Sequence, residues 1–99
     1  MNAPDINRNI LKRHIQAVEA VLPIHILGLL PRGSAGHVRE SDARALEFLA
    51  EKRDGLSIFD LAQAEIDLSE RLGRTVGIVL VSGLRGREAE ELPAMVEAL

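Results

Sequence analysis

The feature that most constrains this chain is a short, largely apolar run, Ile24 to Leu30, which follows Pro23 directly. The run is too short and too apolar for a surface helix, so it predicts a largely buried strand. It ends in the turn sequence Pro31-Arg32-Gly33-Ser34. A strand that breaks at Gly-Ser can bring backbone N–H groups to an anion, because glycine permits close approach and serine adds a hydroxyl. Gly33 and Ser34 are therefore candidate phosphate-binding residues, and a plain tight turn is an equally good interpretation.

The composition predicts a single small domain, residues 1–99. Of the 99 residues 46% are hydrophobic, enough for one core in a chain too short to split in two. The only aromatic residues are Phe48 and Phe59, and we expect both to be buried. Two buried rings provide no stacking platform for bases, and a net charge of -3 provides no footprint for a phosphate backbone. Nucleic acid is therefore not the expected partner.

The sequence also bears on cellular location. It contains no cysteine, which is compatible with a reducing cytoplasm. Residues 1–5 lack the basic and apolar stretches of a targeting signal, and no apolar segment approaches the ~20 residues of a membrane span. We therefore expect a soluble, cytoplasmic protein that does not enter a membrane.

Amphipathic periodicity predicts two helices, one near the N-terminus and one in the second half of the sequence. The first runs from Pro4 to Leu22 and ends at Pro23. The second runs from Ile58 to Leu72, with Ile58 at the start of its apolar stripe. Its ends are marked by a capping pair, Ser57 with Asp60, and by a glycine stop, Gly73.

The last part of the chain predicts one strand and one further helix. Thr75 to Val81 is rich in β-branched residues and reads as a strand. A final helix is expected from Arg87 to Leu99, kinked or restarted at Pro93. The histidines His14 and His25 lie on apolar segments, and a structural role is the better interpretation for both.

The segment from Ser41 to Arg53 has two interpretations. Ser41 is a fair N-cap, and the apolar residues that follow are spaced as one helical face, so local rules favour a helix. The alternative is a short strand from Leu46 to Ala50. With either, the order of elements indicates an α/β (α+β) fold, in which helices pack on a small mixed sheet of about three strands.

Several of these segments together resemble the minimal nucleotidyltransferase family, the small relatives of the polymerase-beta-type nucleotidyltransferases. That family has a strand ending in Gly-Ser, ten further residues, and then Asp-x-Asp followed by apolar residues. Here Gly33-Ser34 is followed, after residues 35–44, by Ala45-Leu46-Glu47-Phe48-Leu49. The segments 56–61 and 68–76 resemble the family's helix start and the helix end that leads into its third strand. The resemblance covers roughly residues 24–85 and implies that Leu46 to Ala50 is a strand.

The departures from the family pattern concern its metal site. Carried over position by position, the three metal-ligand aspartates correspond to Ala45, Glu47 and Gly77, and the basic residue after the Gly-Ser turn is replaced at His37. Glu47 is thus the candidate metal ligand and catalytic carboxylate. Nucleotidyl transfer through two Mg²⁺ ions needs carboxylates to hold them, and alanine or glycine cannot do so. With two of three ligands missing, the resemblance leaves open whether the chain is an enzyme.

The resemblance therefore implies one of two functions. The first is a catalytically inactive or impaired protein without a cofactor, which binds a helical, toxin-like protein as an antitoxin does. The second is an active nucleotidyltransferase that moves a nucleotide from an NTP to a protein or small-molecule acceptor. That activity would require Mg²⁺ and NTP, with Glu40 or Asp42 assisting Glu47. A third, simpler interpretation is an interaction domain that forms a homodimer through the sheet edge or the last helix.

Overall fold

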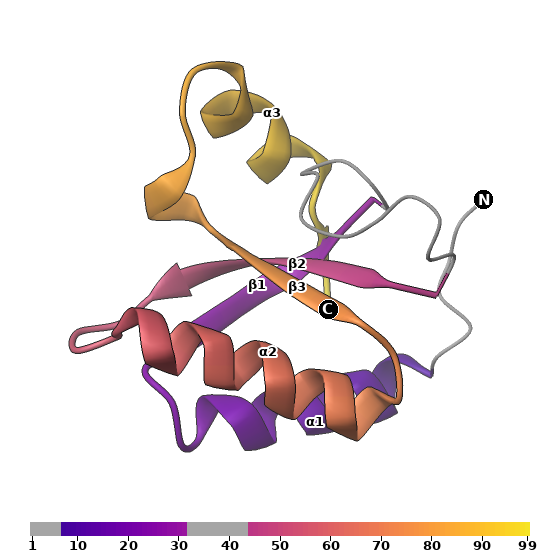
Figure 1. Cartoon of the computed structure of the whole chain (residues 1–99). Helices are drawn as coiled ribbons and strands as arrows, with labels where there is room; N and C mark the ends of the chain where they lie inside the picture. Colours follow the sequence, from indigo (N-terminus) through magenta and orange to yellow (C-terminus); the bar gives the residue numbers. More distant parts are fainter. Residues whose placement is uncertain (1–6, 32–43) are drawn as a thin grey trace.

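A computed structural model describes residues 7–31 and 44–99 of the chain (Figure 1). Its sheet consists, in spatial order, of the strands β3 (Val76–Leu80), β2 (Leu46–Lys52), β1 (Ile24–Leu30) and β4 (Glu97–Ala98). Strand β1 is antiparallel to β2 and β4, and β2 is parallel to β3. The predicted α/β class with a mixed sheet is confirmed, with a short fourth strand beyond the three that we expected. The other elements are α1 (Arg8–Glu19), α2 (Ile58–Leu72), the 3-10 turn η1 (Val81–Gly83) and α3 (Arg87–Met95).

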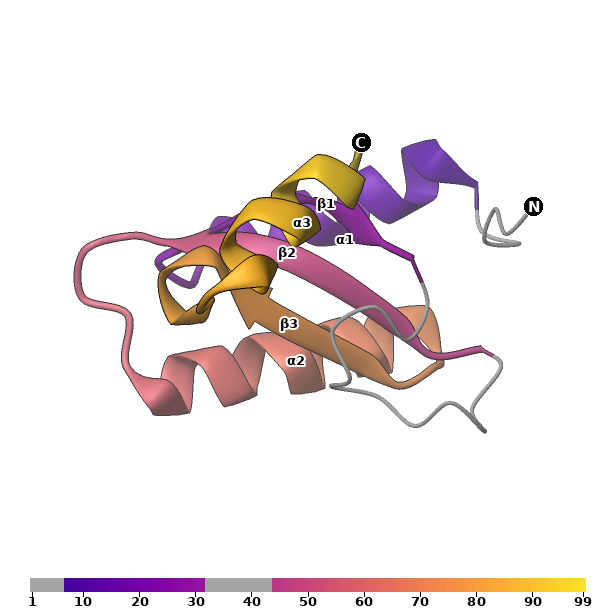
Figure 2. The ribbon, with the colours of Figure 1, turned by 90° about the horizontal axis from the view of Figure 1, so that it is seen from above.

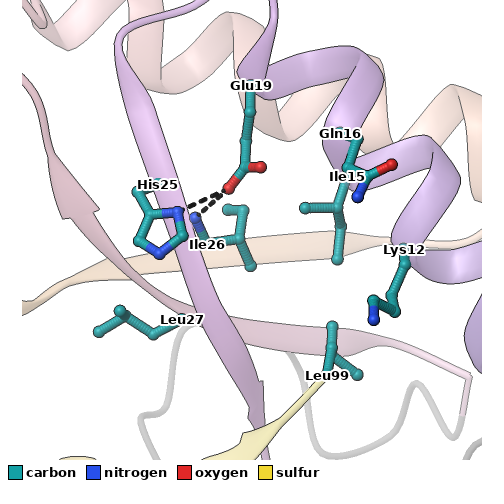
Figure 3. Close-up of a pocket in the computed structure, with 8 residues that line it drawn as sticks. All are labelled: Lys12, Ile15, Gln16, Glu19, His25, Ile26, Leu27 and Leu99. Atoms are coloured by element: carbon teal, nitrogen blue, oxygen red, sulfur yellow. Dashed lines mark hydrogen bonds and ion pairs between the residues drawn. The ribbon is translucent and has the colours of Figure 1, made fainter.

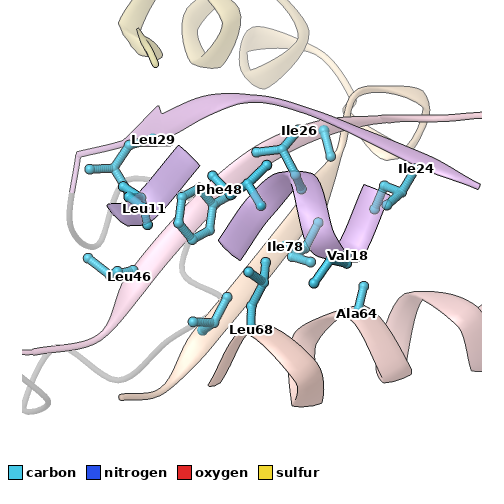
Figure 4. Packing of buried hydrophobic residues seen from close by; sticks show 13 residues of the cluster. Leu11, Val18, Ile24, Ile26, Leu29, Leu46, Phe48, Ala64, Leu68 and Ile78 are labelled. Atoms are coloured by element: carbon cyan, nitrogen blue, oxygen red, sulfur yellow. The ribbon is translucent and has the colours of Figure 1, made fainter. Parts of the chain in front are cut away.

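The helices lie on opposite sides of the sheet, as two views at right angles show (Figures 1 and 2). We call the side covered by α1 and α2 the lower face and the side of α3 the upper face. Between the sheet and the two lower helices lies the main apolar cluster (Figure 4). Its buried members are Leu11, Ile15, Val18, Ile24, Ile26, Leu29, Leu46, Phe48, Ala50, Ala64, Leu68, Val76 and Ile78. The smaller upper cluster contains Leu30, Leu49, Val79, Leu84 and Leu92.

Helix α1 is shorter than the predicted Pro4 to Leu22. It begins after Asn7, whose side-chain oxygen accepts hydrogen bonds from the N–H groups of Asn9 and Ile10, at 2.8 and 3.3 Å. The prediction for residues 4–6 falls outside the described residues. The helix ends at Glu19, after which the N–H groups of Val21 and Leu22 both donate to Val18 O in a turn. Pro23 then disfavours helical backbone at Leu22. Strand β1 then has the predicted bounds.

Strand β2 decides between the two interpretations of residues 41–53. The prediction of a helix from local rules is wrong for residues 46–52, which form a strand. The strand that the resemblance implies is confirmed. The physical reason is burial on both sides, since every residue from Leu46 to Ala50 is buried between β1 and β3. A strand buried on both faces loses the polar alternation that would identify it, so its apolar residues match a helical spacing by chance.

Helix α2 has the predicted bounds and the predicted caps. The Ser57 hydroxyl accepts a hydrogen bond from the N–H of Asp60 at 3.0 Å, and the Asp60 carboxylate accepts one from the N–H of Ser57 at 3.1 Å. Gly73 ends the helix with a φ of 68°. Two expectations about the first turn are wrong, because Ile58 and Phe59 are 76% and 82% exposed. Both precede the part of the helix that contacts the sheet, where Ala64 and Leu68 are buried.

The C-terminal segment differs most from the prediction. The last helix ends at Met95, two residues after Pro93, instead of continuing to Leu99. The chain then extends, and Glu97–Ala98 pairs with Gly28 and Leu29 of β1 as strand β4. Gly28 makes this pairing possible, because a Cβ atom there would lie 2.3 Å from the backbone oxygen of Glu97. Strand β3 is also shorter than the predicted Thr75 to Val81.

Side chains from the helices occupy N–H groups along both long edges of the sheet. At the β3 edge, the Glu65 carboxylate accepts a hydrogen bond from Ile78 N–H at 2.8 Å, and the Ser69 hydroxyl accepts one from Val76 N–H at 3.0 Å. At β1, the Glu19 carboxylate accepts from Ile26 N–H at 2.8 Å. These groups are then not available to pair with a strand from another molecule. None of the helices in the described ranges is long and apolar enough to cross a membrane.

Candidate functional site

The candidate site is built around Glu47, at the centre of the sheet. Its strand, β2, lies between β1 and β3, and the Cα partners of Glu47 are Leu30 on one side and Gly77 on the other. Side chains on a strand alternate between faces. Because Phe48 belongs to the lower cluster and Leu49 to the upper cluster, Glu47 projects from the upper face.

The register brings together the positions that the resemblance assigns to metal ligands. Gly77 is directly beside Glu47 on the parallel strand, at the usual interstrand separation of about 4.8 Å. Ala45 precedes β2 by one residue, and continuing the alternation of the strand places it on the same face as Glu47. Side chains at these three positions could share a metal ion, but only one of the three carries a carboxylate.

Glu47 is also the one buried charged residue in the described part of the chain, with 1% of its surface exposed. A buried carboxylate is stable only if other groups pair with it, because removal of a charge from water costs several kcal/mol. Consistent with this, Glu47 is not without a partner. The chain therefore keeps an acidic group at a central position where an apolar residue would pack at lower cost.

No other carboxylate of the described residues joins Glu47. Glu51 lies on the same face of β2, but four residues along a strand correspond to about 13 Å, and Glu51 is exposed at the far end. Strand β3 contains no acidic residue. Across residues 7–31 and 44–99, no group of three His, Asp or Glu side chains is placed to hold a metal ion. In this part of the chain, the residues present do not fit a two-metal centre.

The other predicted site residues lie outside the described residues. These are Gly33 and Ser34 of the predicted phosphate-binding turn, His37, and the two acidic residues Glu40 and Asp42. In the sequence they lie between β1, whose last residue Leu30 is the partner of Glu47, and the beginning of β2. Their roles therefore remain predictions from the sequence.

Two arginines that the sequence analysis did not single out lie near the beginning of the site. Arg44 precedes Ala45, and Arg74 precedes β3, whose start is held to β2 by a 2.9 Å hydrogen bond from Leu46 N–H to Thr75 O. Each of these arginines has an interaction partner. The sequence signal that could have identified these arginines is their position, because each lies two residues before one of the parallel strands β2 and β3.

The histidines behave largely as expected. His14 is half-buried on α1. His25 has an acidic neighbour that the sequence analysis did not identify, because its Nδ1 lies 3.1 Å from the Glu19 carboxylate. His25 is paired with Glu51 and is remote along the sheet from Glu47, whose β1 partner is Leu30. It does not belong to the site around Glu47.

Comparison with known proteins identifies the fold. No family model and no curated protein matches the sequence. The solved structure of a candidate minimal nucleotidyltransferase aligns over 98% of this chain and 100% of its own, with a TM-score of 0.62 and 22% identity. A chain in the crystal structure of a toxin-antitoxin with AMP-PNP aligns over 94% of this chain and 72% of its own, with a TM-score of 0.65 and 12% identity. The chain therefore has the fold of the minimal nucleotidyltransferases.

Proposed function

We propose that this chain is a nucleotidyltransferase-like protein that has lost nucleotidyl transfer, in whole or in large part, and acts by binding another protein in an antitoxin-like role. The observation that carries the proposal is the composition of three adjacent positions on the upper face of the sheet. Of Ala45, Glu47 and Gly77, only Glu47 has a carboxylate.

The chemistry of the reaction explains why this composition matters. Two-metal catalysis needs oxygen ligands that hold both ions while they neutralise charge on the transferred phosphorus centre. Mg²⁺ takes an octahedral shell of hard oxygen ligands, and neither a methyl group nor a hydrogen atom can contribute one. Glu47 alone would hold Mg²⁺ weakly, with water in the remaining positions. Metal affinity should therefore be far below that of a site with three carboxylates.

The antitoxin-like role is supported by the structural likeness to a chain of a toxin-antitoxin structure. The partner that this role implies is a helical, toxin-like protein. A homodimer through the edge of β3 is less favourable, because Glu65 and Ser69 already accept hydrogen bonds from N–H groups of that edge. A cytoplasmic location is part of the proposal, because a chain without cysteine is compatible with a reducing compartment.

The alternative is an active nucleotidyltransferase. It is favoured by the retention of a buried Glu47 and by the presence of AMP-PNP in one of the similar structures. In this alternative, Glu40 or Asp42 would complete a rearranged Mg²⁺ site with Glu47, and the cofactors would be Mg²⁺ and an NTP.

A transfer assay separates the two functions. The protein is incubated with Mg²⁺, each of the four labelled nucleoside triphosphates, and a purified helical, toxin-like protein as candidate partner and acceptor. We expect a stable complex with that protein in size-exclusion chromatography and no labelled product. Label transfer at an enzyme concentration far below that of the acceptor would contradict the loss of catalysis, and absence of a complex would contradict the binding role.

A further inference from the structure

A small hollow lies between α1 and the outer edge of β1, and it shares no lining residue with the positions around Glu47. Its volume is about 160 Å³. Pockets that hold drug-sized ligands usually measure ~300–1,000 Å³, so only a small molecule fits here. The lining residues, drawn in Figure 3, are Lys12, Ile15, Gln16, Glu19, His25, Ile26, Leu27 and Leu99.

The polar groups of the hollow come mainly from one flank of α1. Lys12, Gln16 and Glu19 are spaced by four and three residues, which places them on the same side of a helix. Among the described residues, the side chains of Lys12 and Gln16 make no hydrogen bond or ion pair with the protein. A cation and an amide, both exposed to solvent, thus line the hollow without a partner in the described part of the chain.

Glu19 is different, because it is held in place. The oxygen Oε2 accepts a hydrogen bond from Ile26 N–H at 2.8 Å and lies 3.1 Å from His25 Nδ1 (Figure 3). The side chain is only 18% exposed. Within the described part of the chain the second oxygen, Oε1, has no protein partner. A fixed carboxylate with one unused oxygen provides a defined site for a cationic group.

The two charges lie at opposite ends of an apolar hollow. Seven residues along α1 separate Lys12 from Glu19, which corresponds to about 10 Å along the helix axis. Between them the lining is aliphatic, from Ile15, Ile26 and Leu99 (Figure 3). A matching ligand has an ammonium group, a carboxylate and a short aliphatic chain between them.

We propose that this hollow binds a small linear zwitterion, an aliphatic ω-amino acid. Its ammonium group donates to Glu19 Oε1, its carboxylate accepts from Lys12 Nζ and the Gln16 amide, and its methylene groups contact the aliphatic lining. With about 10 Å between the two ends and one hydrogen-bond length of ~2.8 Å at each, about 4–5 Å remains for the ligand, which a chain of about two to three methylene groups spans. This site goes beyond the proposed function, and it does not depend on whether the chain transfers nucleotides.

Calorimetric titration with a graded series of ligands tests the proposal. The series consists of ω-amino acids with one to six methylene groups, together with the alkylamine and the alkanoate of matching length. We expect saturable binding with an optimum within the series. The singly charged molecules should bind at least about tenfold more weakly, because each lacks one charge-assisted hydrogen bond.

Variants then test the assignment of the two ends. Lys12→Met should weaken binding about tenfold or more, whereas Arg13→Met removes the same charge one residue away, outside the hollow, and should leave affinity unchanged. Glu19→Gln should also weaken binding, but it alters a group that holds Ile26. If the Glu19 variant misfolds, the affinity of the Lys12 variant alone tests whether the ligand binds in this hollow. Absence of saturable binding to the folded wild type, or equal affinity in Lys12→Met and wild type, would overturn the proposal.

Discussion

The two faces of the sheet differ although they are formed by the same strands. On the lower face, β2 contributes Leu46, Phe48 and Ala50, which are 7%, 0% and 0% exposed and wholly apolar. On the upper face, the same strand contributes Glu47, beside a glycine of β3. The lower face is what a stable fold requires. The upper face keeps features that reduce stability, which is typical of a site retained for binding or chemistry.

The largest expected effect tests the lower face. Phe48→Ala removes a fully buried ring from the main cluster and should lower the free energy of unfolding by about 3–5 kcal/mol. Phe59→Ala is the matched control, because this ring is 82% exposed and its loss should cost less than ~0.5 kcal/mol. Urea denaturation measures both. Similar losses for the two variants would contradict the placement of the core.

A smaller effect is expected on the upper side, where the C-terminal segment joins the sheet. Gly28→Ala places a Cβ atom 2.3 Å from Glu97 O and 2.9 Å from Val96 Cγ2, so β4 must shift away from β1. We expect a loss of about 1–3 kcal/mol, together with faster amide exchange in β4. Gly83→Ala is the control, since an added Cβ meets no atom within 4 Å. Unchanged exchange in β4 of the folded Gly28 variant would show that this pairing is not as described.

Much of the fold could be predicted where local signals suffice. Strand β1 has the predicted bounds because a proline precedes it. Helix α2 has the predicted bounds because a capping box begins it and a glycine ends it. Strand β4 could not be predicted, since two residues carry no periodicity and the pairing depends on Gly28, far away in the sequence. Strand β2 required the resemblance to a family, because its burial on both faces removed the alternating pattern.

For the candidate site, the structure shows that two of the predicted positions are adjacent, while the roles of Glu47, Gly33 and Ser34 stay predictions. The resemblance assigned Glu47 and Gly77 to two positions at which the family has metal-binding aspartates. The parallel register of β2 and β3 makes these two residues direct neighbours. Sequence reasoning missed Arg44 and Arg74, because their proximity to the site depends on which strands are adjacent. It also missed the Glu19 contact of His25, which links a helix to a strand edge.

The most direct test of the central claim is a calorimetric titration of the protein with a non-hydrolysable nucleoside triphosphate, with and without Mg²⁺. The claim is that one carboxylate, at Glu47, remains where three are needed to hold the metal. It predicts that Mg²⁺ adds no binding in the wild type or in Glu47→Gln. Glu51→Gln, which removes a carboxylate from the exposed end of the same strand, serves as the control. Saturable Mg²⁺-dependent binding that Glu47→Gln abolishes and Glu51→Gln preserves would contradict the claim.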